Sequence, residues 1–296
     1  MNKITIPIIA LVFYLLLGIP IFTVKAEENR EEFKINSEFK CSKLKLKDNT
    51  YILDYKYEDI NGDGIKEDII LIGHRPYEPS SPFRDNIKVI IRDRNINKYY
   101  AVSPGKLNSG VGSRLFTGDF DGDKIKDILV TIGTEGSGGC SLYSIFSFKK
   151  NRCSYLIDEE KFSKGLAFEV KYAENFKVNI FNKAVKKLYV LSVENKKDTY
   201  TNLNIYDKSG MLVKETKGSY DSIGNLIPVD IDRDGIYELK SIQALWGICH
   251  MDTLGYGKTI WKYKDNKMQL QSFELLEFAS PGGKEKLQRV IPVWSN

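Results

Sequence analysis

The sequence predicts an all-β protein, a β-propeller-like array of four-stranded units with four or five blades. A nine-residue acidic loop occurs three times, and each copy leads into a short apolar run and then a hairpin-like pair of segments. Four-stranded units that repeat every ~40–60 residues are typical of propellers, because one small sheet cannot bury both of its faces without a neighbour. A β-sandwich or an open stack of repeats is the alternative.

We expect a single domain over residues 27–296, with units near residues 50–104, 112–160, 166–218 and 224–276. The acidic loops begin 60 and then 111 residues apart, so a unit without such a loop is expected between the second and third copies. Residues 33–58 and 275–296 are expected to share a blade that closes the ring.

The composition limits the class of protein. The chain has 296 residues, of which 42% are hydrophobic, 12% aromatic and 28% charged. These values exclude a disordered chain, a collagen-like chain and a multi-span membrane protein. The formal net charge is only +5, and no polybasic block is present. Nucleic acid is therefore not an expected partner.

Residues 1–26 are predicted to be a secretory signal peptide. A short basic start precedes 21 uncharged, mostly apolar residues at positions 4–24, and small side chains follow at the positions that a signal peptidase reads. Cleavage is expected before Glu27, which would make the protein secreted or part of the cell envelope. An uncleaved membrane anchor is the alternative, because 21 residues can cross ~30 Å of hydrocarbon. Pro20, near the end of the run, favours cleavage.

The exported part contains four cysteines, which allows disulfide bonds in an oxidising compartment. Three pairings are possible. We expect Cys140–Cys153, because a predicted hairpin lies between them, and this leaves Cys41–Cys249. A cysteine-bound metal is not expected, because no two cysteines have C-x-x-C spacing and the chain has only two histidines.

Three acidic loops carry the main functional signal. Loop 1 is Asp59–Glu67, loop 2 is Asp119–Asp127 and loop 3 is Asp230–Glu238. Each has oxygen-bearing side chains at positions 1, 3, 5 and 9 and an isoleucine at position 7. Ca²⁺ binds six to eight oxygens at about 2.3–2.6 Å, and alternate positions of a tight loop turn their oxygens toward one centre. A single copy is equally compatible with an ordinary acidic turn, but three copies with the same spacing favour calcium.

The copies differ at a few positions. Asn61 replaces a carboxylate in loop 1, Lys124 stands at position 6 of loop 2 where glycine usually provides a positive φ, and Arg233 occupies position 4 of loop 3. An EF-hand is excluded, because it requires a glutamate at position 12 and flanking helices. Position 12 is Ile70, Val130 and Ser241 in the three loops.

The loops and the apolar strands after them resemble the FG-GAP repeats, also called VCBS-type repeats, of integrin-like β-propellers. The Phe-Gly and Gly-Ala-Pro signatures of that family are missing. The resemblance implies a calcium-binding loop between the first two strands of each blade. The side-chain ligands it implies are Asp59, Asn61, Asp63 and Glu67; Asp119, Asp121, Asp123 and Asp127; and Asp230, Asp232, Asp234 and Glu238. The carbonyls of Ile65, Ile125 and Ile236 are the further ligands.

Together these features predict an exported calcium-binding β-propeller that acts as a non-catalytic extracellular binding or adhesion module. The expected partner is an extracellular protein or polysaccharide. One alternative is an extracellular hydrolase or lyase that acts on glycans or cell-envelope polymers. Another is an assembly subunit held in the membrane by an uncleaved N-terminal segment. A Cys249–His250 nucleophile pair is disfavoured, because the cysteine is expected to be bridged.

Overall fold

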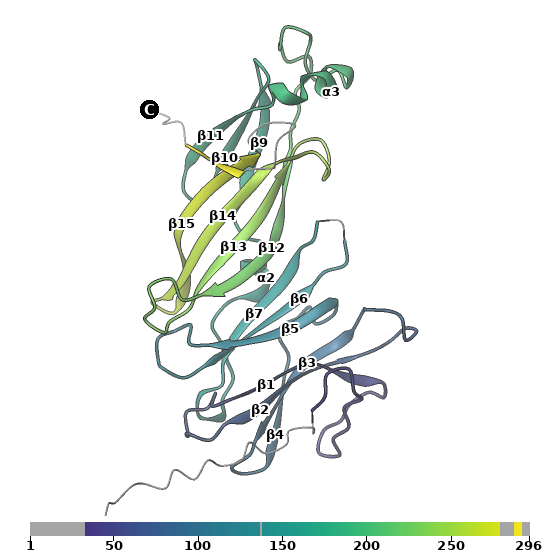
Figure 1. Cartoon of the computed structure of the whole chain (residues 1–296), viewed down its shortest axis with the longest axis vertical. Helices are drawn as coiled ribbons and strands as arrows, with labels where there is room; N and C mark the ends of the chain where they lie inside the picture. The colour runs from purple at the N-terminus through teal and green to yellow at the C-terminus, as the bar shows by residue number, and fades with distance from the viewer. Residues whose placement is uncertain (1–32, 137, 279–286, 292–296) are drawn as a thin grey trace, which may run out of the picture. The chain divides into compact units, whose positions relative to one another are not determined.

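The computed structural model describes residues 33–136, 138–278 and 287–291. The predicted signal peptide lies outside these residues. Within the described ranges, no helix combines the length and the apolar character that crossing a membrane requires. The strands form four antiparallel sheets in chain order, so the all-β prediction is confirmed (Figure 1).

Sheet 1 is a meander of four strands that lie side by side in chain order. They are β1 (Thr50–Glu58), β2 (Glu67–His74), β3 (Asp85–Asp93) and β4 (Lys98–Val102). The inner strand β2 is buried on both faces, which explains its continuous apolar run from Ile69 to Ile72. Its alternate residues enter two different cores, and the outer one is covered by Phe33, Phe39 and Leu44.

Sheet 2 repeats the same meander. Its strands are β5 (Val111–Gly118), β6 (Asp127–Gly133), β7 (Ser141–Ser147) and β8 (Ser154–Tyr155), with the 3₁₀ turn η1 (Lys149–Asn151) before β8. One face of β6, with Ile128 and Val130, packs against sheet 1. The opposite face, with Leu129, packs against residues of sheet 4. The short helix α2 (Glu159–Ser163) follows and lies against β7.

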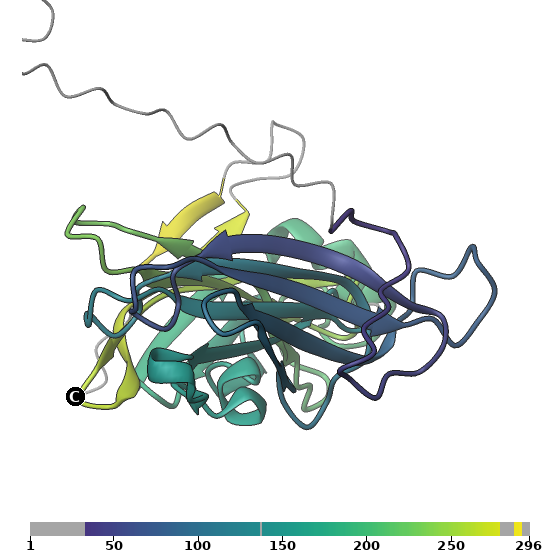
Figure 2. The same ribbon diagram turned by 90° about the horizontal axis from the view of Figure 1, so that it is seen from below.

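Sheet 3 has three strands rather than the predicted four. They are β9 (Phe168–Ala173), β10 (Lys177–Asn182) and β11 (Lys187–Ser192), with β10 in the centre. The chain then forms the 3₁₀ turn η2 (Glu194–Lys196) and α3 (Lys197–Asn202) instead of a fourth strand. In Figure 1, α3 lies at the end of this sheet, and Figure 2 shows the same fold turned by 90°. The helix brings Tyr200 into the core, where it is fully buried, and only a single bridge, Tyr206–Leu212, remains of the expected hairpin.

Sheet 4 has five strands in chain order. They are β12 (Ser219–Val229), β13 (Glu238–Trp246), β14 (Thr253–Lys264), β15 (Lys267–Phe278) and β16 (Leu287–Val290). β16 pairs with β15, whereas β1 pairs with β2, so the predicted blade shared by residues 33–58 and 275–296 is not formed by these strands. None of the apolar clusters of the described residues joins sheet 1 to sheet 3 or sheet 4. Among the described residues the clusters join sheet 1 to sheet 2, sheet 2 to sheet 4 and sheet 4 to sheet 3, and the propeller arrangement stays a prediction.

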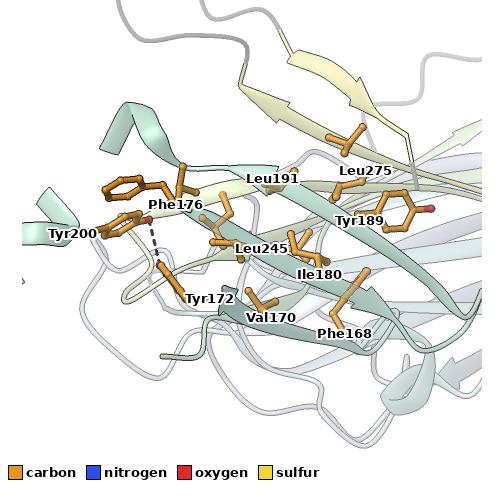
Figure 3. Packing of buried hydrophobic residues seen from close by; sticks show 14 of the residues in the cluster. Phe168, Val170, Tyr172, Phe176, Ile180, Tyr189, Leu191, Tyr200, Leu245 and Leu275 are labelled. Atoms are coloured by element: carbon orange, nitrogen blue, oxygen red, sulfur yellow. Dashed lines mark hydrogen bonds between the residues drawn. The ribbon is translucent and has the colours of Figure 1, made fainter. Parts of the chain in front are cut away.

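The largest apolar cluster joins sheet 3 to sheet 4 (Figure 3). Val170 and Ile180 from sheet 3 lie with Leu245 and Leu275 from sheet 4, and Tyr172 reaches the hydroxyl of Tyr200 at 3.2 Å. Because alternate residues of β9 and β10 are buried, one face of sheet 3 is committed to this core.

We expect Ile180→Ala to lower the free energy of unfolding by about 2–5 kcal/mol, because it leaves a cavity at a fully buried position of this core. Urea denaturation followed by tyrosine and tryptophan fluorescence measures the change. The control is Val213→Ala, since the Val213 side chain is 48% exposed. An equal loss in both variants would contradict the assignment of Ile180 to a tightly packed core.

Candidate metal sites

Each acidic loop connects the first strand of a sheet to the second and is closed by its own side chains. The position-1 aspartate accepts hydrogen bonds from two backbone amides further along the loop, as Asp59 does from Gly62 and Gly64 at 2.8 and 2.9 Å. The position-9 carboxylate accepts from the position-2 amide at 3.0–3.1 Å in all three loops. The donor–acceptor pairs are Ile60 and Glu67, Phe120 and Asp127, and Ile231 and Glu238. The repeat in sequence is therefore a repeat in geometry.

Positions 4 and 6 have left-handed backbone conformations in every loop. The residues are Gly62 and Gly64, Gly122 and Lys124, and Arg233 and Gly235, with φ between 62° and 88°. Lys124 and Arg233 stand where the other loops have glycine, and they adopt the same turn. A residue with a side chain carries a steric cost in the left-handed conformation.

The three loops stack on one another through the same contact. A Cβ on Gly62 would lie 2.6 Å from the Ile125 side chain of loop 2, and a Cβ on Gly122 would lie 3.1 Å from the Ile236 side chain of loop 3. A parallel bridge between Asp119 and Ile236 extends the second contact. Position 7 of one loop thus packs on the position-4 glycine of the loop before it. The sequence has no fourth acidic loop after loop 3. Position 4 of loop 3, on which the isoleucine of such a loop would pack, is the long Arg233.

Loop 1 gathers carboxylates from two parts of the chain. Oxygens of Asp63, Glu67 and Asp93 lie within 4.8 Å of one another. Glu67 and Asp93 are buried, and Asp93 comes from the end of β3. Asp93 was not among the predicted ligands, because its place beside the loop depends on the pairing of β3 with β2. The Asn61 amide donates to Glu67 at 2.9 Å.

Loop 2 brings together Asp119, Asp121 and Asp127 with oxygens within 4.8 Å of one another. Asp127 is completely buried, and its Oδ2 accepts from the Phe120 amide. Its Oδ1 is buried and makes no hydrogen bond of normal geometry within the described residues, although the nearby Ser147 hydroxyl acts to lower the pKa of Asp127. A buried carboxylate oxygen is costly to leave unpaired, so this atom requires a cation or a proton.

Loop 3 also gathers three aspartates, Asp230, Asp232 and Asp234. Here the ammonium group of Lys262, on β14, lies 2.6 Å from Glu238, 3.5 Å from Asp232 and 3.6 Å from Asp234. Its hydrogen bond to Glu238 raises the pKa of Lys262. A positive charge is thus present in this loop.

Burial changes the protonation of the position-9 carboxylates of loops 1 and 2 in the metal-free protein. Removal from water raises the pKa of Glu67 to about 7 and that of Asp127 to about 7. Neighbouring loop carboxylates add to both shifts. The pKa of Asp121 is also raised, mainly by burial. At neutral pH these loops therefore retain protons unless a cation neutralises them.

The predicted ligands fall into two groups. The side chains that the clusters bring together are Asp63, Glu67, Asp119, Asp121, Asp127, Asp230, Asp232 and Asp234. Other predicted ligands bond to the loop backbone, as Asp59 does, and the amides of Ile65, Ile125 and Ile236 donate to the position-5 carboxylates at 2.8 Å. All side-chain donors are oxygens, which fits a hard cation such as Ca²⁺ better than zinc.

The cysteines do not form the predicted disulfides: all four are free thiols. Cys140 precedes β7 and Cys153 follows the turn at its other end, so a seven-residue strand separates them by about 20 Å. A disulfide needs Cα atoms within about 7 Å. The hairpin on which the Cys140–Cys153 pairing was based is present, but it keeps the two residues apart.

The histidine beside Cys249 is engaged with an aspartate. Nε2 of His250 lies 2.9 Å from Asp221, and its ring stacks on Trp246 with centroids 4.4 Å apart. The Trp246 indole also donates to Asp221. The imidazole is therefore held by an aspartate and a tryptophan, which gives no support to a Cys249–His250 pair.

Two cavities lie near α2, outside the loops. One, of about 380 Å³, is lined by Phe162 and Trp261, whose rings meet edge to face, together with Lys161 and Asn266. The other, of about 410 Å³, is lined by Asp158, Glu159, Glu160, Lys106 and Tyr155. Burial raises the pKa of Glu159 there.

Comparison with known proteins identifies the family. The model of the YybI C-terminal domain matches residues 166–276, which run from two residues before sheet 3 through most of sheet 4. The protein named "Uncharacterized protein YybI" of Bacillus subtilis (strain 168) is 30% identical over 222 residues, which are 75% of this chain and 83% of that protein. The chain belongs to the YybI family. No solved structure matched it.

The predicted FG-GAP or VCBS membership is therefore wrong, because the matching family model is that of the YybI C-terminal domain. The error has a physical origin. Alternating oxygens with glycines at the turn are a local solution for closing an acidic loop, and this YybI-family chain uses that solution at loops that stack on one another. The same short pattern on different folds does not establish kinship.

We expect Gly62→Ala to destabilise the protein more than Gly64→Ala. Both glycines have the same left-handed conformation, with φ of 83° and 84°. Either substitution costs about 1–2 kcal/mol of backbone strain. Only Gly62 faces a neighbour, so its variant must also displace Ile125, which costs a further ~1–3 kcal/mol. Urea denaturation measures the difference, and equal losses would argue against loop stacking.

The metal-free protein should become less stable as the pH rises from about 4 to 7, because the folded-state pKa of Asp127 is about 7 and its ordinary value is 3.8. The proton-linked stability is complete below the lower value and is lost as pH passes the higher one. In EGTA, Asp127→Asn should therefore melt above the wild type at pH 8 and close to it at pH 4.5. A melting difference independent of pH would refute this assignment.

Proposed function

We propose that the protein is an exported calcium-binding protein that uses its β-sheet array as a non-catalytic extracellular binding or adhesion module. The proposal that the protein binds calcium rests on the environment of Asp127. Its side chain is fully buried, one carboxylate oxygen makes no hydrogen bond of normal geometry within the described residues, and it lies in a cluster with Asp119 and Asp121. A divalent cation would pair that oxygen and remove the repulsion among the three carboxylates.

The role of calcium in this proposal is structural. In loop 2 it would be held by Asp119, Asp121 and Asp127, and in loop 1 by Asp63 and Glu67 with the added Asp93. These side chains sit where the first strand turns into the second, so a bound ion would fix the turn and the start of β2 and β6. Binding to the folded state alone adds stability of RT ln(1 + [Ca²⁺]/Kd).

The binding role is supported by two features. The apolar N-terminal stretch favours export to a compartment where free calcium is abundant. The cavity at Phe162 and Trp261 combines aromatic faces with the polar groups of Lys161 and Asn266, a combination suited to a sugar ring or an apolar side chain. A polysaccharide or a protein is thus the proposed partner. The propeller arrangement belongs to the proposal, supported by the in-order meander of sheets 1, 2 and 4.

A hydrolase or lyase is the second candidate, and one observation favours it. The cavity beside Tyr155 is lined by Asp158, Glu159 and Glu160, and burial raises the pKa of Glu159. A pair of carboxyl groups can serve as acid and base in glycoside cleavage. Turnover on a panel of glycans that is lost in Glu159→Gln would support this candidate over the binding role.

We expect calcium to raise the melting temperature of the EGTA-treated protein. A hundredfold excess over Kd adds about 2.7 kcal/mol per site. Titration calorimetry with CaCl₂ and thermal unfolding with and without EGTA measure binding and stabilisation. Asp127→Asn should lose one equivalent of calcium and most of the stabilisation that this site provides.

The matched control for this experiment is Asp48→Asn, an exposed aspartate outside the loops. It should bind calcium and melt as the wild type does. A wild-type protein that shows no calcium heat at millimolar concentrations and the same melting temperature in EGTA would refute the calcium-binding function.

A further inference from the structure

In sheets 1, 2 and 4, which carry the acidic loops, the second strand begins with the position-9 carboxylate. The third strand places one residue opposite it. The pairs Asp68–Arg92, Ile128–Phe146 and Leu239–Trp261 define the antiparallel registers. One step further along each ladder, Glu67 faces Asp93, Asp127 faces Ser147 and Glu238 faces Lys262. This single register position therefore carries an anion in sheet 1, a neutral hydroxyl in sheet 2 and a cation in sheet 4.

In loop 3 that cation contacts most of the oxygen positions. Lys262 reaches the carboxylates at positions 3, 5 and 9, and its shortest contact is 2.6 Å to Glu238. The Glu238 side chain is only 5% exposed, so its charge needs a partner inside the protein. The two oxygens of Asp230 accept from the amides of Asp234 and Gly235, as those of Asp119 in loop 2 accept from Gly122 and Lys124, so position 1 does not distinguish the two loops.

In the part of the chain that the structure describes, no lysine stands opposite the position-9 carboxylate of loop 2. Lys149 forms an ion pair with the position-5 Asp123, and its side chain is 46% exposed. One buried oxygen of Asp127 makes no hydrogen bond of normal geometry within the described residues. The two loops share backbone geometry and carboxylate positions and differ in what neutralises position 9.

We infer that Lys262 is a built-in cation that takes the place of a metal ion in loop 3, so that this loop closes without calcium. The inference rests on the proposed function for its contrast with loop 2. A calcium ion needs oxygens at about 2.3–2.6 Å around one centre, and an ammonium group among the same oxygens excludes it by volume and by charge. Lysine and metal are alternative solutions at one register position.

The test is Lys262→Met, which keeps the length of the side chain and removes its charge. In EGTA the variant should melt several degrees below the wild type, because Glu238 loses its counterion. In titration calorimetry it should bind one more equivalent of calcium than the wild type, and saturating calcium should restore much of the lost melting temperature. Either wild-type stability in EGTA or an unchanged number of calcium equivalents would overturn the inference.

Two controls separate charge at this site from other effects. Lys264→Met removes an exposed lysine two residues further along β14 and should change neither readout. Asp232→Asn should leave the number of calcium equivalents of the wild type unchanged, because loop 3 holds none. The loss of an equivalent in Asp232→Asn would overturn the inference even if the Lys262 variant failed to fold.

The reciprocal variant is Ser147→Lys, which introduces a lysine opposite Asp127. It should bind one equivalent of calcium fewer than the wild type, and its melting temperature should respond less to EGTA. Full retention of the equivalents would contradict the role of this register position.

A failure of this inference can be distinguished from a failure of the proposed function. If the wild type binds no calcium, the proposed function fails. The destabilisation of the Lys262 variant in EGTA is still expected, because that contact needs no metal.

Discussion

The hydrogen bond between the position-9 carboxylate and the position-2 amide is the interaction on which each acidic loop depends. It has the same length, 3.0–3.1 Å, in all three loops. It joins the end of the first strand to the start of the second, and it forces a carboxylate to the inner edge of the sheet. In loops 1 and 2 that carboxylate is fully buried. The fold therefore creates a buried negative charge wherever it makes this turn, and each sheet has to neutralise it.

The stacking of the loops makes this requirement collective. Because Ile125 packs on Gly62 and Ile236 on Gly122, the position of one loop constrains the next. A loop that opened through carboxylate repulsion would displace the isoleucine resting on it or the glycine beneath it. Neutralisation in one sheet thus supports the packing between sheets as well as the local turn, which links the electrostatics of single residues to the stability of the array.

The sequence was sufficient to predict the strands around the loops and the oxygen positions within them, because both are local patterns. It could not show Asp93, Ser147 and Lys262 beside position 9, since their place follows from the pairing of the second and third strands. It misplaced a disulfide because the hairpin between Cys140 and Cys153 separates them by the length of β7. A fourth strand was predicted for sheet 3, but the chain forms α3 there, and Tyr200 of this helix packs in the core. Tertiary packing, rather than the local sequence pattern, decides this segment.

The limits of the family match separate the loop that has an internal lysine from the two loops that do not. The YybI C-terminal domain, over residues 166–276, contains sheet 3, which has no acidic loop, and loop 3, which carries Lys262. Loops 1 and 2, whose buried carboxylates lack an internal lysine at the same register position, both precede it. The matched domain can therefore close its turns with side chains of its own, whereas the preceding sheets need protons or a cation from solution. Through the contact of Ile236 with Gly122, the loop that carries Lys262 lies at one end of the stack and packs directly on loop 2.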